Sequence, residues 1–233
     1  MAGRGTHRVT ARLALYWAPE VTDPLHTAAS RWLGRDAETG ATFPQDPLPG
    51  LDIAEITADA RNYGFHATLK PPFRLATSYD AARAEAVALA ARTAPFELPP
   101  LAVMDLGGFL ALRESTPCPA LQALADACVT ALDPHRAPPT EAEVARRRPE
   151  RLSEAQRTML SRWGYPYVFA EWQFHLTLSR RLSAEEKAVV MPAAQRAVGE
   201  VAARPRVVRE LCLFTQVTSG APFLIAERLP LGG

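Results

Sequence analysis

Hydrophobic and polar positions follow a period of two in several short runs along the chain. Residues 11–18, ARLALYWA, form an apolar run that Pro19 ends, and they are predicted to be the first strand. The phrases GFHATLKPPF at 64–73 and QFHLTLSRRL at 173–182 alternate apolar with polar side chains, which predicts two more strands. We expect the first of these two to stop at Pro71 and Pro72, since proline cannot donate to a sheet ladder.

Helical spacing and capping residues predict five helices between the strands. Asp23 can cap the first helix, Ser153 and Ser183 can cap two later ones, and Gly34 can end the first. An alanine-rich run with few helix breakers predicts another. The expected helices cover 24–33, about 79–93, 119–132, 153–163 and 183–202. Residues 134–152, rich in proline and arginine, are the least regular segment, and whether they close over a site is left open.

The order of these elements occurs twice. In each half, a strand with His-x-Thr precedes an alanine-rich helix and then two strands joined at a glycine-containing turn, Gly107–Gly108 or Ser219–Gly220. This repeat predicts a duplicated β-α-β-β unit, and hence an α+β fold of two lobes that face each other, each with antiparallel sheet packed against helices. We expect residues 1–10 to be a flexible tail and 11–233 to be a single bilobal domain with one motif in each lobe.

The repeated motif places an imidazole beside a hydroxyl on one strand face. Side chains two apart on a strand point the same way, so His66 shares a face with Thr68, and His175 with Thr177. Lys70 continues the first polar face and Ser179 the second. The alternating apolar residues take the opposite face, where they can hold the strands against helices.

Two histidines and two hydroxyls in one cleft suit phosphoryl transfer without a metal ion. Near pH 7 one imidazole can be neutral and accept a proton, while the other is charged and donates one to the leaving oxygen. The hydroxyls of Thr68 and Thr177, with the Lys70 ammonium, can donate hydrogen bonds to the phosphate oxygens. One histidine on a strand is more often a structural residue, but two of only five histidines in the same phrase favour a shared function.

Other candidate chemistry is weaker. The three cysteines have no spacing typical of a metal site or a disulfide framework, and the sequence has neither GxxxxGK[ST] nor GxGxxG. Tyr16, Tyr63 and Ser179 are the candidate pocket residues. Tyr165 can also shape a pocket, although aromatic residues in strands are usually core. The basic run from Arg146 to Arg151 is either a solvated surface or a lid or clamp for an additional phosphate.

The composition limits the classes of binding partner that the chain is expected to have. Of the 233 residues, 48% are hydrophobic and 22% are charged, with a formal net charge of +1, so no strong field attracts long nucleic acid or a membrane. No stretch approaches the roughly 20 apolar residues of a membrane span. We therefore expect a cytoplasmic protein with a small-molecule partner and no metal or cofactor.

The two His-x-Thr phrases resemble the paired motifs of the 2H phosphoesterase superfamily. ALYWAP, WLGRD, YGFHATLKPPF and GYPYVF with FHLTLS are further similar to a branch of phosphonate-metabolism proteins found beside carbon–phosphorus lyase genes. The resemblance implies a LigT-like, bilobal α+β fold whose lobes are related by a pseudo-twofold axis, with metal-independent hydrolysis of a phosphodiester. It also implies that His66 and His175 are the acid and base, in an order left open, and that Thr68 and Thr177 are phosphate ligands.

Within that resemblance, the favoured substrate is a small cyclic phosphate, such as a ribosyl 1,2-cyclic phosphate from phosphonate breakdown. The main alternative is an RNA 2',3'-cyclic phosphodiesterase or 2'-5' ligase-like enzyme acting on RNA ends with the same residues. A third reading is a phosphate- or nucleotide-binding module without turnover. Oligomeric state is not indicated by the sequence.

Overall fold

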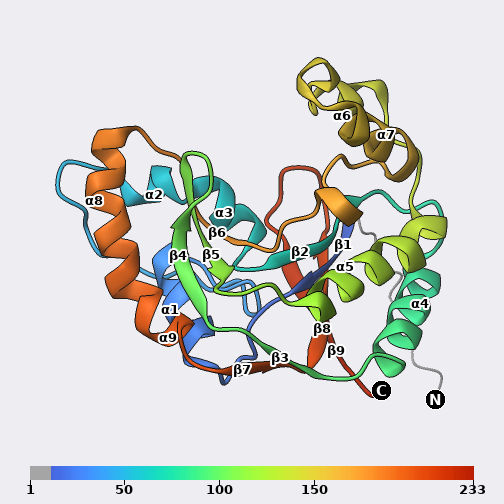
Figure 1. Ribbon diagram of the computed structural model, residues 1–233, viewed down its shortest axis with the longest axis horizontal. Helices are drawn as coiled ribbons and strands as arrows, with labels where there is room; N and C mark the ends of the chain where they lie inside the picture. Colours follow the sequence, from blue (N-terminus) through green and yellow to red (C-terminus); the bar gives the residue numbers. More distant parts are fainter. Residues whose placement is uncertain (1–11) are drawn as a thin grey trace.

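An antiparallel sheet of seven strands organises the molecule (Figure 1). The computed structural model describes residues 12–233, so the tail expected at residues 1–10 lies outside the described residues. The strands are β1 (Arg12–Trp17), β2 (Ala67–Phe73), β3 (Phe96–Leu98), β4 (Leu101–Asp105), β5 (Phe109–Glu114), β6 (Leu176–Arg181), β7 (Arg206–Val208), β8 (Glu210–Gln216) and β9 (Leu224–Pro230). The large sheet has the order β4-β5-β6-β2-β1-β8-β9, and β3 pairs with β7 separately.

The helices begin close to the capping residues that predicted them. They are α1 (Pro24–Leu33), α2 (Ile53–Ile56), α3 (Ala58–Tyr63), α4 (Tyr79–Ala91), α5 (Pro119–Leu132), α6 (Glu141–Ala145), α7 (Glu154–Trp163), α8 (Ala184–Ala194) and α9 (Glu200–Ala202). Asp23, Ser153 and Ser183 all cap helices with their side chains, as expected. The predicted last helix is continuous in space but passes through a π-helical turn, Gln195–Gly199, between α8 and α9.

The α+β prediction is confirmed, and the repeated order of elements is present on both sides of the sheet centre. However, the hairpins are exchanged between the halves. The β4–β5 hairpin follows the first motif along the chain but pairs with β6, which carries the second motif. The β8–β9 hairpin follows the second motif and pairs with β1, beside β2. Each half of the sheet is therefore completed by strands from the other half of the sequence.

Strand β2 continues through Pro71 and Pro72 to Phe73, beyond the predicted end. Its pairing with β6 is confined to Ala67 and Leu176, so the prolines face no β6 ladder. On the other side, Leu13 pairs with Phe73 and Leu15 with Lys70, so a single β1 residue between these pairs opposes the two prolines of β2. A bulge of this kind tolerates residues without an N–H, and this explains why the strand persists.

The two faces of the sheet are packed differently. One face contributes Leu15, Leu69, Leu178 and Leu213 to the large core that the helices α1, α4, α5 and α8 complete. The other face carries a smaller buried cluster that includes Tyr16, Phe214 and Phe223. The polar side of both motif strands faces away from the large core, as the alternation predicted.

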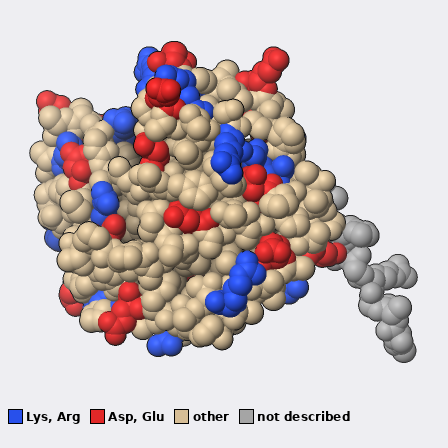
Figure 2. Space-filling model, turned by 45° about the vertical axis from the view of Figure 1, so that its right-hand side comes forward, with Lys and Arg blue, Asp and Glu red and all other residues tan. Residues whose placement is uncertain are grey.

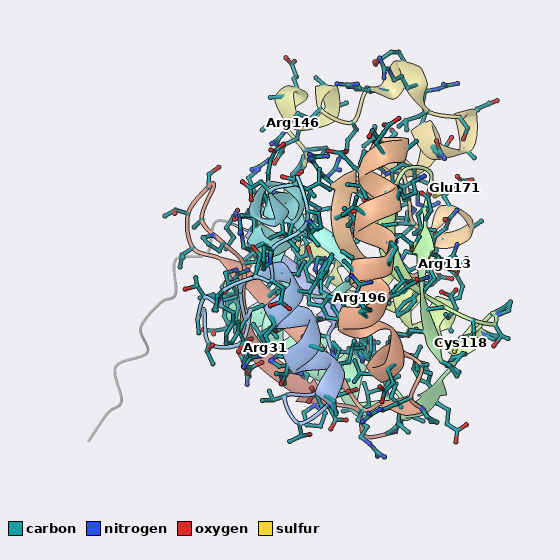
Figure 3. All side chains as sticks on the ribbon, turned by 90° about the vertical axis from the view of Figure 1, so that its left-hand side faces the viewer. Arg31, Arg113, Cys118, Arg146, Glu171 and Arg196 are labelled. Atoms are coloured by element: carbon teal, nitrogen blue, oxygen red, sulfur yellow. The ribbon has the colours of Figure 1, made fainter. Side chains whose placement is uncertain are left out.

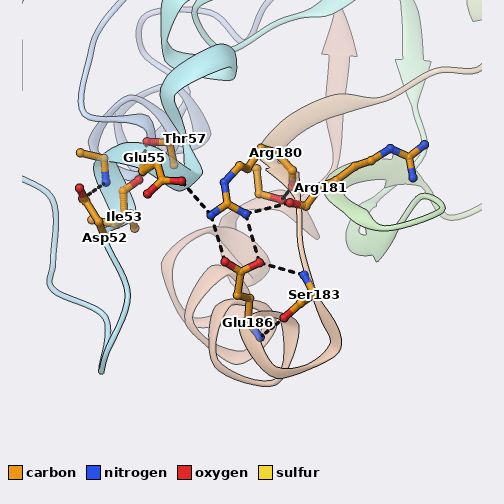
Figure 4. A network of polar contacts seen from close by, with 10 residues as sticks. Asp52, Ile53, Glu55, Thr57, Arg180, Arg181, Ser183 and Glu186 are labelled. Carbon is orange, nitrogen blue, oxygen red and sulfur yellow. Dashed lines mark hydrogen bonds and ion pairs between the residues drawn. The ribbon is translucent and has the colours of Figure 1, made fainter.

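Arg180, at the end of β6, connects two helices (Figure 4). Its guanidinium donates to both carboxylate oxygens of Glu186, at 3.0 and 3.1 Å, and to Glu55 at 3.2 Å. Glu186 also accepts from the backbone N–H of Ser183, completing the capping box of α8. The network fixes the position of α2 and α8 relative to the second motif strand.

The turn before His66 depends on Gly64. Its φ of 81° and ψ of 170° lie in a region that is essentially restricted to glycine, and an added Cβ would lie 2.4 Å from the Cβ of Ala37. Arg35 holds this turn from behind by donating to the carbonyls of Arg61, Asn62 and Phe223 at 2.8, 3.1 and 2.9 Å.

Gly64→Ala is expected to lower the free energy of unfolding by about 3 kcal/mol, because it adds backbone strain and a steric clash. Gly50→Ala is the matched control: Gly50 also has a positive φ of 70°, but nothing lies within 4 Å of its added Cβ. The Gly50→Ala control should lower the free energy of unfolding by about 1 kcal/mol. Equal losses for the two variants in chemical denaturation would contradict this view of the turn.

Candidate functional site

The two motif strands meet at one position. Ala67 of β2 pairs with Leu176 of β6 in antiparallel register. In such a register the flanking residues His66 and Thr177 oppose each other on one side of the pair, and Thr68 and His175 on the other. All four side chains take the face opposite to that of the buried pair. The register thus gathers both histidines and both threonines around a single point at the centre of the sheet.

His66 is held in one orientation. Its Nδ1 lies 2.8 Å from the carbonyl oxygen of Gly64, to which a neutral ring donates, and its Nε2 then accepts from the Thr68 hydroxyl at 3.2 Å. The ring stacks on Tyr16 with a centroid distance of 3.8 Å and an interplanar angle of 20°. Backbone and ring contacts therefore leave Nε2 as the nitrogen that can exchange a proton.

His175 is held in a similar way. Its Nδ1 lies 2.9 Å from the carbonyl oxygen of Gln173, again two residues earlier in the chain. The edge of Phe109 packs against the ring at a centroid distance of 5.8 Å. The two halves of the sheet thus use the same device, a carbonyl oxygen at position −2 relative to the histidine, to fix the imidazole tautomer.

Burial lowers the pKa of both histidines. For His66 the pKa falls to about 4, mainly through burial and further through the nearby His175, against the opposite effect of the Gly64 carbonyl. For His175 burial again dominates, and the charge of Arg113 acts in the same direction. The sequence predicted one neutral and one charged ring near pH 7, whereas in the protein without ligand both rings favour the neutral form.

Two tryptophan indoles donate hydrogen bonds to backbone carbonyls of the motif strands. Trp172 Nε1 donates to the carbonyl oxygen of Thr68 at 2.8 Å, and Trp32 Nε1 donates to that of Leu178 at 2.9 Å. Each indole thereby gives a strand carbonyl a hydrogen-bond partner. Neither tryptophan was predicted to belong to the site, because nothing local in the sequence relates an indole to a carbonyl on a distant strand.

A cavity of about 480 Å³ opens beside this junction. Thr68 and His175 line it, together with Tyr165, Trp172 and other residues of the β4–β5 turn and the 165–173 segment. Its volume suits a small organic ligand, and its lining combines aromatic, hydroxyl and imidazole groups with the carboxylates of Asp105 and Glu171.

Lys70 does not join the two histidines. It is 2% exposed, and its Nζ donates to the carbonyl oxygen of Val129 at 2.9 Å and to Asp133 at 3.4 Å, at the end of α5. The pairs Tyr16–Thr68 and Leu15–Lys70 leave Leu69 as an extra residue in β2. This bulge interrupts the alternation and turns Lys70 toward the helices. The expected phosphate contact by Lys70 is therefore replaced by a structural role.

The three expected pocket residues have different positions. Tyr16 is 1% exposed and supports the His66 ring from behind. Tyr63 is half-buried, with its ring 6.2 Å from that of His66 and stacked on Phe223. Ser179 lies away from the junction: its hydroxyl accepts from the Leu110 N–H at 2.9 Å, in the irregular stretch where β5 and β6 shift register.

Thr177 is half-buried and pairs with Ala111 of β5 in the sheet. Among residues 12–233, no group of three or more histidine, cysteine, aspartate or glutamate side chains is arranged to hold a metal ion. Within the same range, no helix is long and apolar enough to cross a membrane.

Comparison with known proteins assigns the family. The model of DUF1045, described as a protein of unknown function, matches residues 68–224. The chain belongs to the DUF1045 family. The matched range contains Thr68, His175 and Thr177, and it begins two residues after His66.

Two curated relatives of this DUF1045 chain are described as ribose 1,5-bisphosphate phosphokinase PhnN. The one from Janthinobacterium sp. (strain Marseille) is 38% identical over 231 residues, covering 95% of the chain and 51% of the relative. The one from Laribacter hongkongensis (strain HLHK9) is 35% identical over 220 residues, covering 93% and 51%. The DUF1045 chain thus spans about half the length of these relatives.

Solved structures similar to the DUF1045 chain include E. coli LigT complexed with NADP+, at a TM-score of 0.46 and 13% identity, covering 96% of this chain and 99% of that one. A structure described as a phosphoesterase has a TM-score of 0.45 and 14% identity, with the same coverage.

The low pKa of His66 predicts how stability depends on pH. The unfolded chain takes up a proton near pH 6.5 and the folded chain near pH 4, so acidification through this window favours unfolding. Between pH 7 and pH 4, the free energy of unfolding of the wild type should fall by roughly 2–3 kcal/mol more than that of His66→Gln. Denaturation curves measured at both pH values test this, and an equal fall in the two proteins would contradict a buried, neutral His66.

Proposed function

We propose that this chain is a metal-independent phosphodiesterase of the 2H phosphoesterase type that opens a small cyclic phosphate by two-histidine acid–base catalysis. The observation that carries the proposal is the register around Ala67 and Leu176, with His66 and His175 on one face of adjacent strands. Both rings are anchored through Nδ1, so both Nε2 atoms remain for proton transfer. A phosphorus atom between two such nitrogens has a proton acceptor on one side and a donor on the other.

The reaction balances with these groups and one water molecule. One Nε2 accepts a proton as the water oxygen forms its bond to phosphorus, and the bond from phosphorus to one ring oxygen breaks. The other Nε2 gives its proton to that leaving oxygen, which becomes a hydroxyl. The product is a phosphate monoester, and one imidazole has lost a proton that the other has gained.

Substrate binding favours protonation of one of the two imidazoles. Because burial disfavours the charged form of both rings, the anionic phosphodiester is the group that raises the pKa of the histidine next to the leaving oxygen. The hydroxyls of Thr68 and Thr177 are placed to donate to the non-bridging oxygens, where charge builds up in the transition state. In the free protein the Thr68 hydroxyl lies on His66 instead, and it exchanges this partner for the phosphate.

A ribosyl cyclic phosphate is the substrate class that the relatives favour. Their described kinase activity concerns a ribose with phosphates at positions 1 and 5, and this chain matches about half of their length. Opening a ribosyl 1,2-cyclic phosphate at its 2-oxygen leaves a phosphate on carbon 1. We infer that this part of the relatives performs a separate step on a related sugar phosphate, linked to phosphonate metabolism.

The test is phosphorus NMR of the purified protein with ribose 1,2-cyclic and nucleoside 2',3'-cyclic phosphates in EDTA. Ring opening is expected in the wild type, and His66→Ala or His175→Ala should each lower turnover by about a hundredfold or more, since each removes one proton transfer. His135→Ala is the matched control. His135 follows α5 and its ring contacts the hydroxyl of Thr77, away from the two motifs, so this variant should turn over substrate at the wild-type rate.

Full activity after removal of either imidazole would contradict the acid–base pair. Loss of activity in EDTA that zinc or magnesium restores would contradict the metal-independent mechanism. If only the nucleoside 2',3'-cyclic phosphate is opened, the acid–base mechanism is supported and the ribosyl 1,2-cyclic substrate is contradicted.

A further inference from the structure

A second, smaller cavity lies next to the histidine site. Its volume is about 180 Å³, and it is formed by the start of β1, the end of β2 and the segment from residue 136 to 147. Five arginines and one glutamate are its charged lining residues: Arg12, Arg74, Arg136, Arg146, Arg147 and Glu143. On the face that Figure 2 brings forward, Lys and Arg side chains gather in the upper half, near the α6–α7 segment.

Three of the five arginines already have protein partners. Arg74 donates to Glu143 through two nitrogens, at 3.3 and 3.2 Å, and this contact lowers the pKa of Glu143 to about 2. Arg136 donates to Asp133 at 2.8 Å, and Arg12 donates through Nε to Gln216 at 2.7 Å. The one carboxylate that lines the cavity is thus bound to Arg74.

Arg146 and Arg147 have no hydrogen-bonded or ion-paired partner for their guanidinium groups within residues 12–233. Arg147 lies over the Tyr165 ring at 4.6 Å, which gives it a defined position without neutralising it. Figure 3 shows Arg146 on the α6–α7 segment at the top of the molecule. Several guanidinium groups surround a small cavity, and three of them, those of Arg12, Arg146 and Arg147, have no carboxylate partner within the described residues. Such a cavity is suited to binding a phosphate.

The cavity adjoins the His66 side of the catalytic junction. Tyr63 lines it and has its ring 6.2 Å from that of His66. Arg147 contacts Tyr165, which lines the larger cavity beside His175. The aromatic rings of Tyr63 and Tyr165 therefore separate the arginines from the histidines, and a sugar ring can pack against such rings.

We propose that the arginine cavity binds a second phosphate of the substrate, one that does not react. The inference rests on the proposed function and names the substrate more closely: a ribosyl cyclic phosphate with a terminal phosphate on carbon 5. The cyclic phosphate lies between the histidines, the ribose lies against the tyrosines, and the terminal phosphate binds Arg147 and Arg146. The arginines position the substrate and take no part in proton transfer.

The kinetic test compares ribose 1,2-cyclic phosphate with its 5-phosphorylated form. The wild type should prefer the second by at least tenfold in kcat/KM. Arg147→Ala should lose about 10- to 100-fold on the 5-phosphorylated substrate, mostly in KM, and less than threefold on the other, because a charge-assisted bond to phosphate is removed. Arg151→Ala is the control: Arg151 lies on the same segment, is 69% exposed and does not line the cavity.

A binding test separates this inference from the catalytic proposal. Ribose 5-phosphate contains no phosphodiester, so calorimetry can measure its binding whether or not the chain is an enzyme. Binding that weakens at least tenfold in Arg147→Ala, but is unchanged in Arg151→Ala and His66→Ala, supports the phosphate subsite. Absence of binding, or equal affinity in wild type and Arg147→Ala, overturns the subsite even if ring opening is observed.

Discussion

The central constraint of this structure is the single antiparallel pair between Ala67 and Leu176. Strands β2 and β6 are paired at this one position and diverge beyond it. The pair joins the two halves of the sheet, and the divergence leaves room for the cavity beside the sheet centre. The residues on either side of the pair are the four polar side chains of the two motifs. Trp172 donates to the carbonyl oxygen of Thr68 beside this pair, so that backbone acceptor has a hydrogen-bond partner.

Burial at this junction determines the chemistry. Tyr16 and Phe109 pack against the two half-buried imidazoles and reduce their contact with water, which disfavours a positive charge on either ring. In the proposed reaction, a bound phosphodiester places its negative charge beside the imidazoles. Under that proposal, protonation of one histidine is coupled to substrate binding, and the same low-dielectric surroundings strengthen the hydrogen bonds from the threonine hydroxyls.

The sequence predicted the parts of the site that depend on strand period and helix caps. His66 and Thr68 share a face because nothing interrupts the alternation between them. Lys70 and Ser179 could not be placed from the sequence, because both lie where bulges shift the register, and a bulge depends on the partner strand. The exchange of hairpins was missed for a similar reason: the order of elements along the chain does not state which edge a hairpin joins. The arginines from residue 146 onward were noted, but their proximity to Tyr63 and Tyr165 is a tertiary feature.

The most direct test of this account is nitrogen NMR of the protein labelled with ¹⁵N-histidine, with signals assigned through His66→Gln and His175→Gln. At pH 7 the account predicts that both rings carry their proton on Nδ1, and that both Nε2 signals respond to added inorganic phosphate with the same saturation curve. An Nε2-protonated tautomer for either ring, or a response of only one ring at saturating phosphate, would contradict the claim that the two histidines act on one phosphate.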